Sequence, residues 1–593
     1  MRLAAILFLP CLVSAQLIPA GAPIPKGPNP PVVFLNGYQL GCIGPSDFAG
    51  TFGNADKVLQ ASGIASVFFD NCTVSAAGGQ PTIEAIGIAF GKFLAALKYS
   101  DGSAVAQVDA VVHSMGGLIL RSYLAGKLDV TPAAYAPPAT TGIREAVFIG
   151  TPHFGSPLAP RLGSDIQTAE MSPGSQFLFD LNTWNGGVDD LRGVDALAIA
   201  GSGGTGLESG GGPGFDDGVV ALTSASLGFI PSVPKGRTRV VPGCHTNISL
   251  LYLAGACADG TPPIAVITDA SNIVGQIVTS FLTGTNAWQS LGQAIEDNAL
   301  ASTNGGVYLQ FQDSKGIAQN APATIPSSLT ASKSNQVLWS EKLAAGGPVT
   351  FSFTPNPVTF TPAAGTITPL ISKPGPVIRG AVPAGGAVFP LDVAPGAYVA
   401  IYGSALGGST LVAPGPNFPT QLGDVQVSVN GTAAKVQFIS AGQINMIWPD
   451  AAPGLTKLTV TNAAGSFTTN VIVQPTVPTV FTFDGTAAAA ENAVTGAFVN
   501  ASAPLVSGSD YVALFLTGLG ETTPKNGLDY ANIQPEVTIG GKACTVLYAG
   551  RVYGVPALDQ INCQIPGGLS GTAVPVVVSA NGRTANTVTL NIK

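Results

Sequence analysis

Ser114 stands in the segment of the chain that is best suited to chemistry. Residues 108–112 (Val-Asp-Ala-Val-Val) predict a strand, and residues 117–124 predict a helix that follows it. A sharp turn between a strand and a helix exposes a serine hydroxyl above the sheet, an arrangement known as the nucleophile elbow, G-x-S-x-G. Val112 replaces the first glycine of that pattern with a larger side chain. We therefore predict Ser114 as a nucleophile in a slightly altered elbow.

A serine nucleophile needs a base, and the chain has only three histidines. His113 directly precedes Ser114, so its side chain is expected to point away from the hydroxyl. His153 follows an expected strand, but it comes too early for the chain order serine, acid, histidine, and it more simply braces a loop. His245 lies late in the same part of the chain, on a loop after an apolar strand. We predict His245 as the base.

The acid that orients the base should lie between Ser114 and His245, on a loop after a strand. Residues 215–220 (Phe-Asp-Asp-Gly-Val-Val) fit, because the glycine permits a tight turn and the valines anchor it. We predict Asp217 as the acid, and its neighbour Asp216 could replace it or bind a cation. Weaker candidates lie in a segment expected to form a helical lid: Asp180, Asp189 and Asp190.

An oxyanion hole needs two backbone N–H groups that point at the developing negative charge. The residue after the nucleophile, Met115, supplies one of them. The loop after the first expected strand, residues 34–39 (Phe-Leu-Asn-Gly-Tyr-Gln), supplies the other. Tyr38 is the predicted donor on that loop, with Gln39 as the second choice.

These residues share a region in which strands and helices alternate. Apolar runs predict strands at residues 31–35, 64–69, 108–112 and 147–150, and apolar residues at helical spacing predict a helix over 83–97. Such alternation indicates a doubly wound, mostly parallel α/β sheet. We assign residues 16–285 to this catalytic domain.

The rest of the chain is predicted to be all β. Short alternating apolar runs, separated by Pro, Gly and Asn, predict a β-rich connecting domain with a Pro-rich linker over residues 286–372. An internal repeat follows: residues 427–431 match 537–541, and residues 442–445 match 559–562. We assign one β-sandwich to residues 373–482 and a second to residues 483–593. If all these units are accessory, a chain that ends near residue 290 should keep its catalytic activity.

The first 15 residues are predicted to be a secretory signal peptide. Arg2 provides the positive charge, an apolar stretch follows, and Ala15 ends a small-residue cleavage site. Export places the mature chain outside the cytoplasm, in an oxidising compartment. Proximity in the chain favours three disulfides among the remaining cysteines: Cys42–Cys72, Cys244–Cys257 and Cys544–Cys563.

Composition excludes several classes of function. Only 10% of the residues are charged, and 25 basic against 33 acidic residues give a net charge of −8, so the basic footprint of a nucleic-acid-binding protein is missing. No apolar run beyond the N-terminus reaches the roughly 18 residues of a transmembrane helix. With no C-x-x-C pair and three histidines, a Cys/His zinc site is not expected, and we predict no cofactor.

Several segments resemble secreted bacterial lipases of the class 2 group and the related PGAP-like inositol deacylases. They are residues 36–38 (Asn-Gly-Tyr), 113–117 (His-Ser-Met-Gly-Gly), 150–156 (Gly-Thr-Pro-His-Phe-Gly-Ser), 171–182 (Met-Ser-Pro-Gly-Ser-Gln-Phe-Leu-Phe-Asp-Leu-Asn) and 217–220 (Asp-Gly-Val-Val). Asn36 takes a position at which lipases usually have histidine. The resemblance spans about residues 30–260 and implies an α/β-hydrolase fold.

The same resemblance implies the hydrolysis of a small-molecule or lipid carboxylic ester through an acyl-enzyme. In that reaction Ser114 attacks, His245 transfers the proton and Asp217 holds the imidazole. Family analogy also allows calcium, although no ligand set stands out. Residues 171–182 resemble the helical cap beside a lipase active site. Their apolar side chains, with Trp184, form either a cap over the site or simply the core under a helix.

The two C-terminal units resemble Ig-like β-domains of the IPT/TIG type. This resemblance implies an accessory role, such as binding a cell-surface or polymer ligand. Alternatives remain open at this point. The same triad could deacylate phospholipids or transfer the acyl group to an alcohol, and the whole chain could instead be an inert adhesive or matrix-binding protein.

Overall fold

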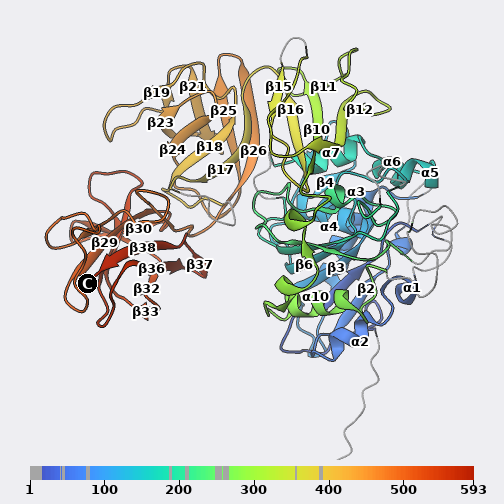
Figure 1. The fold of residues 1–593 in the computed structure, drawn as a ribbon, viewed down its shortest axis with the longest axis horizontal. Helices are drawn as coiled ribbons and strands as arrows, with labels where there is room; N and C mark the ends of the chain where they lie inside the picture. The colour runs from blue at the N-terminus through green and yellow to red at the C-terminus, as the bar shows by residue number, and fades with distance from the viewer. Residues whose placement is uncertain are drawn as a thin grey trace, which may run out of the picture.

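The computed structural model describes residues 17–39, 42, 47–74, 80–185, 190–206, 213–246, 257, 266–353, 357–385 and 392–593. The predicted signal peptide, residues 1–15, lies outside the described residues. Figure 1 shows an α/β part in blue to green on the right, with further β-sheets above it and two β-sandwiches in orange and red on the left.

A seven-stranded sheet forms the centre of the α/β part. Its strands are β1 (Val32–Leu35), β2 (Ser66–Phe69), β3 (Val108–His113), β6 (Ile143–Ile149), β7 (Asp195–Gly201), β8 (Thr238–Val241) and β9 (Gln293–Ala294). Their spatial order is β2-β1-β3-β6-β7-β8-β9, and all neighbours pair in parallel except β8 and β9. The chain winds from β1 to β2 and then back past β1 to β3. Loops after β1 and β3 therefore flank the switch point, where ligands bind in open parallel sheets.

Helices cover both faces of this sheet. One face packs against α3 (Ile83–Ala96), α4 (Met115–Ala125) and α7 (Gln176–Thr183), and the other against α1 (Phe48–Phe52), α2 (Ala55–Gln60) and α10 (Ile273–Leu282). Alternate residues of one strand enter different cores, as Val33 and Phe34 do. Short elements complete the connections: α5 (Ala159–Leu162), α6 (Ile166–Glu170), α8 (Leu222–Ala225), β4 (Lys127–Leu128) and β5 (Ala134–Tyr135). A sheet buried on both faces explains why its strands read as continuous apolar runs.

The α/β architecture with a parallel sheet is confirmed, with small shifts in its elements. Helix α4 begins at Met115, two residues earlier than predicted, because the turn at Ser114 leads into it directly. Strand β6 begins at Ile143, four residues earlier than the apolar run indicated. Arg144 and Glu145 interrupt the apolar run at this start, since both are charged and only partly buried.

A second sheet contains β10 (Asn304–Gln312), β11 (Ala318–Gln319), β12 (Thr330–Ala331), β13 (Val337–Ala344) and β16 (Ile367–Ser372), beside a hairpin of β14 (Val349–Phe351) and β15 (Val358–Phe360). The expected Pro-rich linker is wrong here, because β15 and β16 are strands. Pro369 is tolerated in β16 because, among the described strands, β16 pairs with β10 alone and is therefore an edge strand. An edge position can spare the N–H that proline lacks.

This second sheet packs directly on the α/β part. The Tyr308 hydroxyl accepts a hydrogen bond from the Gly174 amide at 2.6 Å, and its ring lies 6.1 Å from the Phe179 ring. Gln310 donates to the Gln176 side chain at 3.0 Å. Tyr308 is fully buried in the same core as α7. The connecting sheet is therefore continuous with the α/β core.

Two β-sandwiches complete the chain, each with its own core. The first combines β17 (Val377–Pro383), β18 (Tyr398–Ser404), β19 (Leu411–Val412), β23 (Lys435–Ile439) and β24 (Gln443–Ile447) with β20 (Gln421–Leu422), β21 (Val425–Val429), β22 (Thr432–Ala433), β25 (Gly454–Asn462) and β26 (Gly465–Val473). The second combines β27 (Thr479–Val480), β28 (Ala490–Asn492), β29 (Tyr511–Thr517), β30 (Thr522–Lys525), β31 (Leu528–Ala531), β34 (Thr545–Arg551) and β35 (Asp559–Gln564) with β32 (Glu536–Ile539), β33 (Lys542–Ala543), β36 (Gly571–Ala580), β37 (Arg583–Thr584) and β38 (Val588–Ile592).

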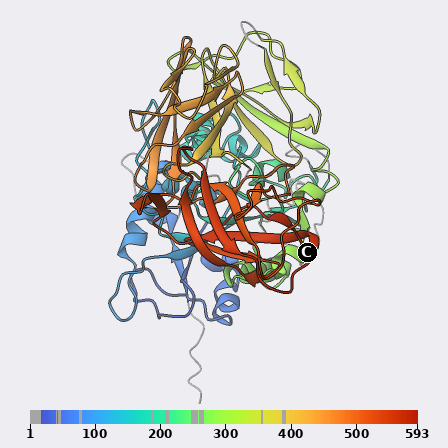
Figure 2. The ribbon, with the colours of Figure 1, turned by 90° about the vertical axis from the view of Figure 1, so that its left-hand side faces the viewer.

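The internal repeat corresponds to equivalent strands of the two sandwiches. Strand β21 of the first occupies the place of β32 in the second, and β24 occupies that of β35. Figure 2 shows the second sandwich facing the viewer in red, with the α/β part behind it. Over the described residues, none of the helices combines the length and the apolar character needed to cross a membrane.

The packing of the second sheet changes the expected result of truncation. A chain that ends at residue 290 loses Tyr308, Val337 and Ile367, which are buried in the α/β core. The loss of each buried side chain lowers the free energy of unfolding by about 1.5–3 kcal/mol. The whole free energy of unfolding of a protein is only about 5–15 kcal/mol. We expect this chain to melt at a lower temperature or aggregate, whereas a chain that ends at residue 372 melts cooperatively. Circular dichroism melting and size-exclusion chromatography test this, and equal melting curves would contradict it.

Candidate active site

Ser114 occupies the turn between β3 and α4 with φ 54° and ψ −126°. A positive φ is rare and strained for a residue other than glycine, at a cost of about 1–3 kcal/mol. The amide of Ser114 donates to the carbonyl of Ile149 at 2.9 Å, which fixes the turn to the end of β6. Val112, at the position of the missing glycine, is fully buried in the core shared with α4, so its size does not crowd the hydroxyl.

Glycines let the loop after β1 approach this turn. A Cβ atom on Gly37 would lie 2.7 Å from Cβ of Ser114, closer than real side chains allow. A Cβ atom on Gly116 would lie 2.7 Å from the carbonyl oxygen of Leu35. Gly117 likewise faces the side chain of Thr151 with no room for a methyl group. The backbone of the β1 loop therefore lies directly against Ser114, as the switch point requires.

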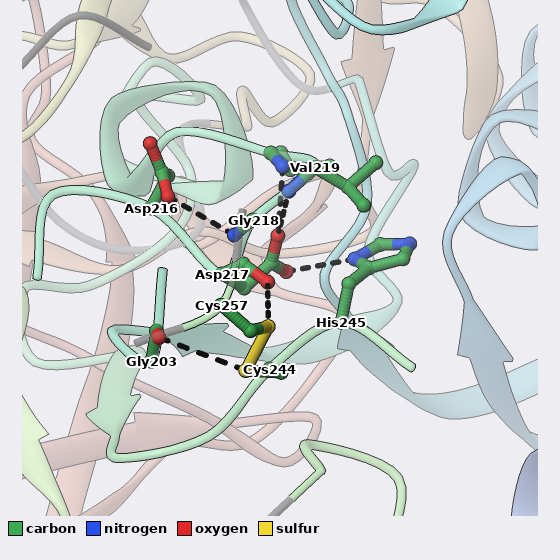
Figure 3. The surroundings of a disulfide bond; sticks show 9 residues. Gly203, Asp216, Asp217, Gly218, Val219, Cys244, His245 and Cys257 are labelled. Carbon is green, nitrogen blue, oxygen red and sulfur yellow. Dashed lines mark hydrogen bonds and ion pairs between the residues drawn. A yellow bond between two sulfur atoms is a disulfide. The ribbon is translucent and has the colours of Figure 1, made fainter. Parts of the chain in front are cut away.

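The structure brings His245 and Asp217 together (Figure 3). His245 Nδ1 lies 2.7 Å from Asp217 Oδ2, and both side chains are buried. The other carboxylate oxygen, Oδ1, accepts from the amides of Val219 at 3.0 Å and Val220 at 2.7 Å. This pairing assigns the imidazole proton to Nδ1. Within the described residues Nε2 makes no hydrogen bond, so it is the nitrogen that can accept a proton.

The other aspartates have different partners. Asp216 accepts from the Gly218 amide at 3.0 Å, and its carboxylate points away from His245 in Figure 3. Asp180 accepts from Gln176 at 2.6 Å, and Asp190 forms a buried ion pair with Arg121 at 3.0 Å. Asp189 lies outside the described residues. Of the four described aspartates considered, Asp217 is the one that contacts the predicted base.

Ser114 and His245 both adjoin the carboxyl end of β6. Ile149 accepts the Ser114 amide, and a Cβ atom on the next residue, Gly150, would lie 2.9 Å from His245 Nδ1. In the described part of the chain, the Ser114 hydroxyl makes no direct hydrogen bond to His245. Catalytic hydrogen bonds of this kind commonly tighten only when a substrate binds. Ser114 and His245 thus lie beside the end of one strand without a hydrogen bond between their side chains, and Asp217 lies at the end of the neighbouring strand β7.

His113 lies against the base, a contact that the sequence did not indicate. Its Nε2 lies 3.1 Å from the His245 carbonyl oxygen, and the two rings are 4.6 Å apart. Burial, together with the nearby His245, holds the pKa of His113 well below its usual range. His113 is therefore neutral and donates its Nε2 proton to that carbonyl. A neutral neighbour does not repel a positive charge that forms on His245.

His153 is fully buried on the loop after β6. Arg121 Nη1 lies 3.3 Å from His153 Nδ1, and Asn182 donates to the His153 carbonyl at 2.8 Å. Burial, with the charge of Arg121, lowers the pKa of His153 well below its usual range. His153 therefore connects this loop to α4 and α7 as a neutral group.

The two predicted oxyanion donors flank the elbow. Among the described residues, the amides of Tyr38 and Met115 donate to no acceptor, and the amide of Gln39 is equally unengaged. Side chains hold the β1 loop in place. Asn36 accepts from the Gly37 amide at 2.8 Å, and Asn71 donates to the Gly37 carbonyl at 2.9 Å. Asn36, in the place where lipases usually have histidine, thus stabilises the loop.

Tyr38 also connects the β1 loop to α6. Its hydroxyl donates to Asp165 Oδ2 at 2.6 Å, and Asp165 caps α6 through the Thr168 amide at 2.9 Å. Burial and the Asp165 carboxylate raise the pKa of Tyr38 above its usual range, so the hydroxyl keeps its proton. The side chain of Tyr38 thus fixes the loop that carries its own amide.

All three expected disulfides are present: Cys42–Cys72, Cys244–Cys257 and Cys544–Cys563. Cys244 directly precedes His245, and Sγ of Cys257 lies 3.8 Å from the Asp217 carbonyl oxygen (Figure 3). The His245 amide donates to the same Asp217 carbonyl at 2.8 Å, so the second disulfide lies beside the contact between the two loops. In the part of the chain that the structure describes, no group of three or more His, Cys, Asp and Glu side chains is arranged to hold a metal.

The apolar residues of the expected cap are buried. Phe177, Leu178, Phe179 and Leu181 are at most 5% exposed, and they belong to the core that α7 shares with the sheet. Of the two interpretations of this segment, the structure favours the core under a helix. These side chains do not form an exposed apolar lid.

Comparison with known families finds one match, in the first sandwich. Residues 398–476 match the IPT/TIG domain. The expected IPT/TIG-type unit over 373–482 is thus supported for these residues. A search of curated proteins found no match.

Three solved structures to which this chain is similar are distant from it in sequence. Phospholipase PlaB from Legionella pneumophila, in complex with thio-NAD, is 12% identical with a TM-score of 0.39, covering 59% of this chain and 94% of that one. The mature Bacillus licheniformis lipase BlEst2 is 19% identical with a TM-score of 0.27, covering 38% and 89%. A Bacteroides ovatus protein, SGBP-B, in complex with a mixed-linkage heptasaccharide, is 13% identical with a TM-score of 0.20, covering 49% and 60%. At these TM-scores the likenesses carry no weight for function.

The buried, neutral His113 predicts a pH dependence of stability. Because its pKa is lowered in the fold, the unfolded chain takes up a proton first as the pH falls below about 6.5. His113→Gln keeps an N–H donor and removes this titration. Between pH 6.5 and 5, we expect the unfolding free energy of the wild type to fall more steeply than that of the variant, by up to about 1.4 kcal/mol per pH unit. Urea denaturation at each pH measures both slopes, and parallel slopes would refute the prediction.

Proposed function

We propose that this chain is a serine carboxylic-ester hydrolase with an α/β-hydrolase fold. The observation that carries the proposal is the 2.7 Å contact between His245 Nδ1 and Asp217 Oδ2, beside a serine in a strained strand–turn–helix elbow. A buried carboxylate that orients an imidazole, with Nε2 left to act as a base, is the triad arrangement of serine hydrolases. Export, deduced from residues 1–15, is part of the proposal, and the three disulfides support an oxidising compartment.

The proposed reaction begins at the Ser114 hydroxyl. His245 Nε2 takes the hydroxyl proton while Oγ attacks the carbonyl carbon of an ester, and a tetrahedral oxyanion forms. Asp217 stabilises the resulting imidazolium through Nδ1, and the neutral His113 adds no opposing charge. The amides of Tyr38 and Met115 donate to the oxyanion, which is where preorganised donors contribute most.

The intermediate then collapses to an acyl-enzyme. The alcohol leaves with the proton that His245 carries, and the acyl group stays on Oγ. In the second half of the reaction, His245 takes a proton from water and the resulting hydroxide attacks the acyl carbon. The carboxylic acid then leaves, and Ser114 regains its proton from His245. An alcohol in place of water would give acyl transfer, and a phospholipid ester would give deacylation, through the same groups. A lipid or small-molecule ester is the proposed substrate, by resemblance of the site segments to lipases.

The two sandwiches are proposed as accessory domains that bind a cell-surface or polymer ligand. The match of residues 398–476 to the IPT/TIG domain supports this role. None of the predicted catalytic or oxyanion residues lies in them. They would place the catalytic unit near its substrate without taking part in the reaction.

Ser114→Ala tests whether the serine is an activated nucleophile. A fluorophosphonate probe should label the wild type and fail to label the variant. Hydrolysis of p-nitrophenyl esters should fall by at least about 10³-fold, since residual catalysis comes only from the oxyanion hole and binding. Equal thermal melting of both proteins is the control for folding. A folded wild type with neither labelling nor hydrolysis would overturn the enzyme proposal in favour of an adhesive protein.

Asp217→Asn and Asp216→Asn form a matched pair, because both are buried neighbours on one loop. Asn at position 217 cannot hold the imidazole in the required tautomer, so kcat should fall by on the order of 10⁴-fold. Asp216 contacts the Gly218 amide and not His245, so its variant should lose much less activity. Steady-state kinetics with one ester measure kcat for both variants. A larger loss at Asp216 would assign the acid to that residue.

A further inference from the structure

A cavity of about 180 Å³ lies where the α/β part, the connecting sheet and the first sandwich meet. Its walls come from the end of α7 (Asn182 and Thr183), from Phe229, from strands β16 and β17, and from Phe467 of β26. None of the proposed catalytic or oxyanion residues lines it. It is therefore a separate site, and an occupant would touch three units of the chain at once.

The lining is mostly apolar, with Asn182, Thr183, Thr368 and Arg379 as its polar residues. Phe229, Leu370, Ile371, Ile378 and Phe467 contribute hydrocarbon surface, and Arg379 is the one charged residue of the lining. Pockets for drug-sized ligands measure about 300–1,000 Å³. This cavity is smaller, so it fits a single short alkyl chain better than a two-chain lipid or a polycyclic ligand.

Within the described residues, Arg379 has no partner of opposite charge, unlike four other arginines of the chain. Arg121, Arg144, Arg551 and Arg583 pair with Asp190, Asp109, Asp559 and Asp392. Within the described residues, the guanidinium of Arg379 has neither a hydrogen bond nor an ion pair, and it is exposed at the rim of the cavity. Partial burial lowers its pKa, with no charged neighbour contributing. An unpaired cation beside an apolar cavity is complementary to an anion with an apolar tail.

We propose that this cavity binds a medium-chain fatty acid, with the alkyl chain between Phe229 and Phe467 and the carboxylate on Arg379. A guanidinium presents a planar pair of donors that matches a carboxylate. A single cation in the lining suits a monoanion. The proposal stands independently of the ester hydrolase, because the site shares no residue with the proposed triad.

Occupancy would also stabilise the junction of the three units. The ligand contacts α7 and Phe229 of the α/β part, β16 of the connecting sheet, and β17 and β26 of the first sandwich. A molecule that binds only the folded arrangement stabilises it in proportion to its concentration relative to Kd. The fatty acid would thus fasten the first sandwich to the rest of the chain.

Isothermal titration calorimetry of the full mature chain with octanoate tests this, using Ser114→Ala as the background. We expect saturable binding of one octanoate, about fourfold tighter than hexanoate for each added methylene, as burial of hydrocarbon predicts. Arg379→Gln should weaken octanoate binding by about fivefold, the value of a partly exposed ion pair, and leave binding of uncharged 1-octanol unchanged. Lys435→Gln, an exposed cation on β23 of the same sandwich, is the matched control and should have no effect.

A second variant fills the cavity. Thr368→Trp places a large side chain in the lining of β16 and should abolish binding while the protein still melts cooperatively. Absence of saturable octanoate binding to the parent would overturn the proposal. Binding that survives both Arg379→Gln and Thr368→Trp would also overturn it, by placing the fatty acid elsewhere. Neither result depends on esterase activity, which the Ser114 comparison measures separately.

Discussion

The hydrogen bond between His245 and Asp217 depends on two loops that start from neighbouring regions of one sheet edge. Asp217 is held by the amides of Val219 and Val220, so its carboxylate has one oxygen left for the imidazole. The His245 amide donates to the Asp217 carbonyl at 2.8 Å, and Cys257 of the neighbouring Cys244–Cys257 disulfide contacts the same carbonyl. Glycines at positions 150 and 201 leave the space in which these loops approach the strand ends, since a Cβ atom there would lie 2.9 Å from His245 Nδ1 and 2.7 Å from Asp217 Cβ. The geometry of the site is therefore a consequence of close backbone packing.

The two other histidines of the chain are buried and uncharged, and His113 lies directly against His245. His113 donates to the backbone of His245, and His153 accepts from Arg121. Burial lowers the pKa of both, so neither carries a positive charge at neutral pH. Arg121 in turn is neutralised by Asp190. The histidine that lies against His245 is therefore neutral, and the arginine beside His153 is paired.

The domain organisation follows contacts more than it follows composition. Residues after 300 have the β-rich sequence pattern of the sandwiches, and their proline content predicts a linker. Tyr308 nevertheless stacks near Phe179 and accepts from Gly174, which joins this sheet to α7. Such contacts link residues more than 120 positions apart in the chain, and no local pattern encodes them. The cavity beside Arg379 arises at the same junction, because three separately patterned units meet there.

The sequence by itself determined the strand–turn–helix around Ser114, the parallel sheet, the repeat and the three cysteine pairs, since these follow from apolar periodicity and chain order. It also ranked Asp217 above Asp216 through the neighbouring glycine, and the structure places Asp217 on His245. Only the tertiary structure decided the position of His113, the strand at Pro369 and the burial of the α7 side chains. Each of these depends on which residues from a distant part of the chain pack against it, and a single sequence does not specify those partners.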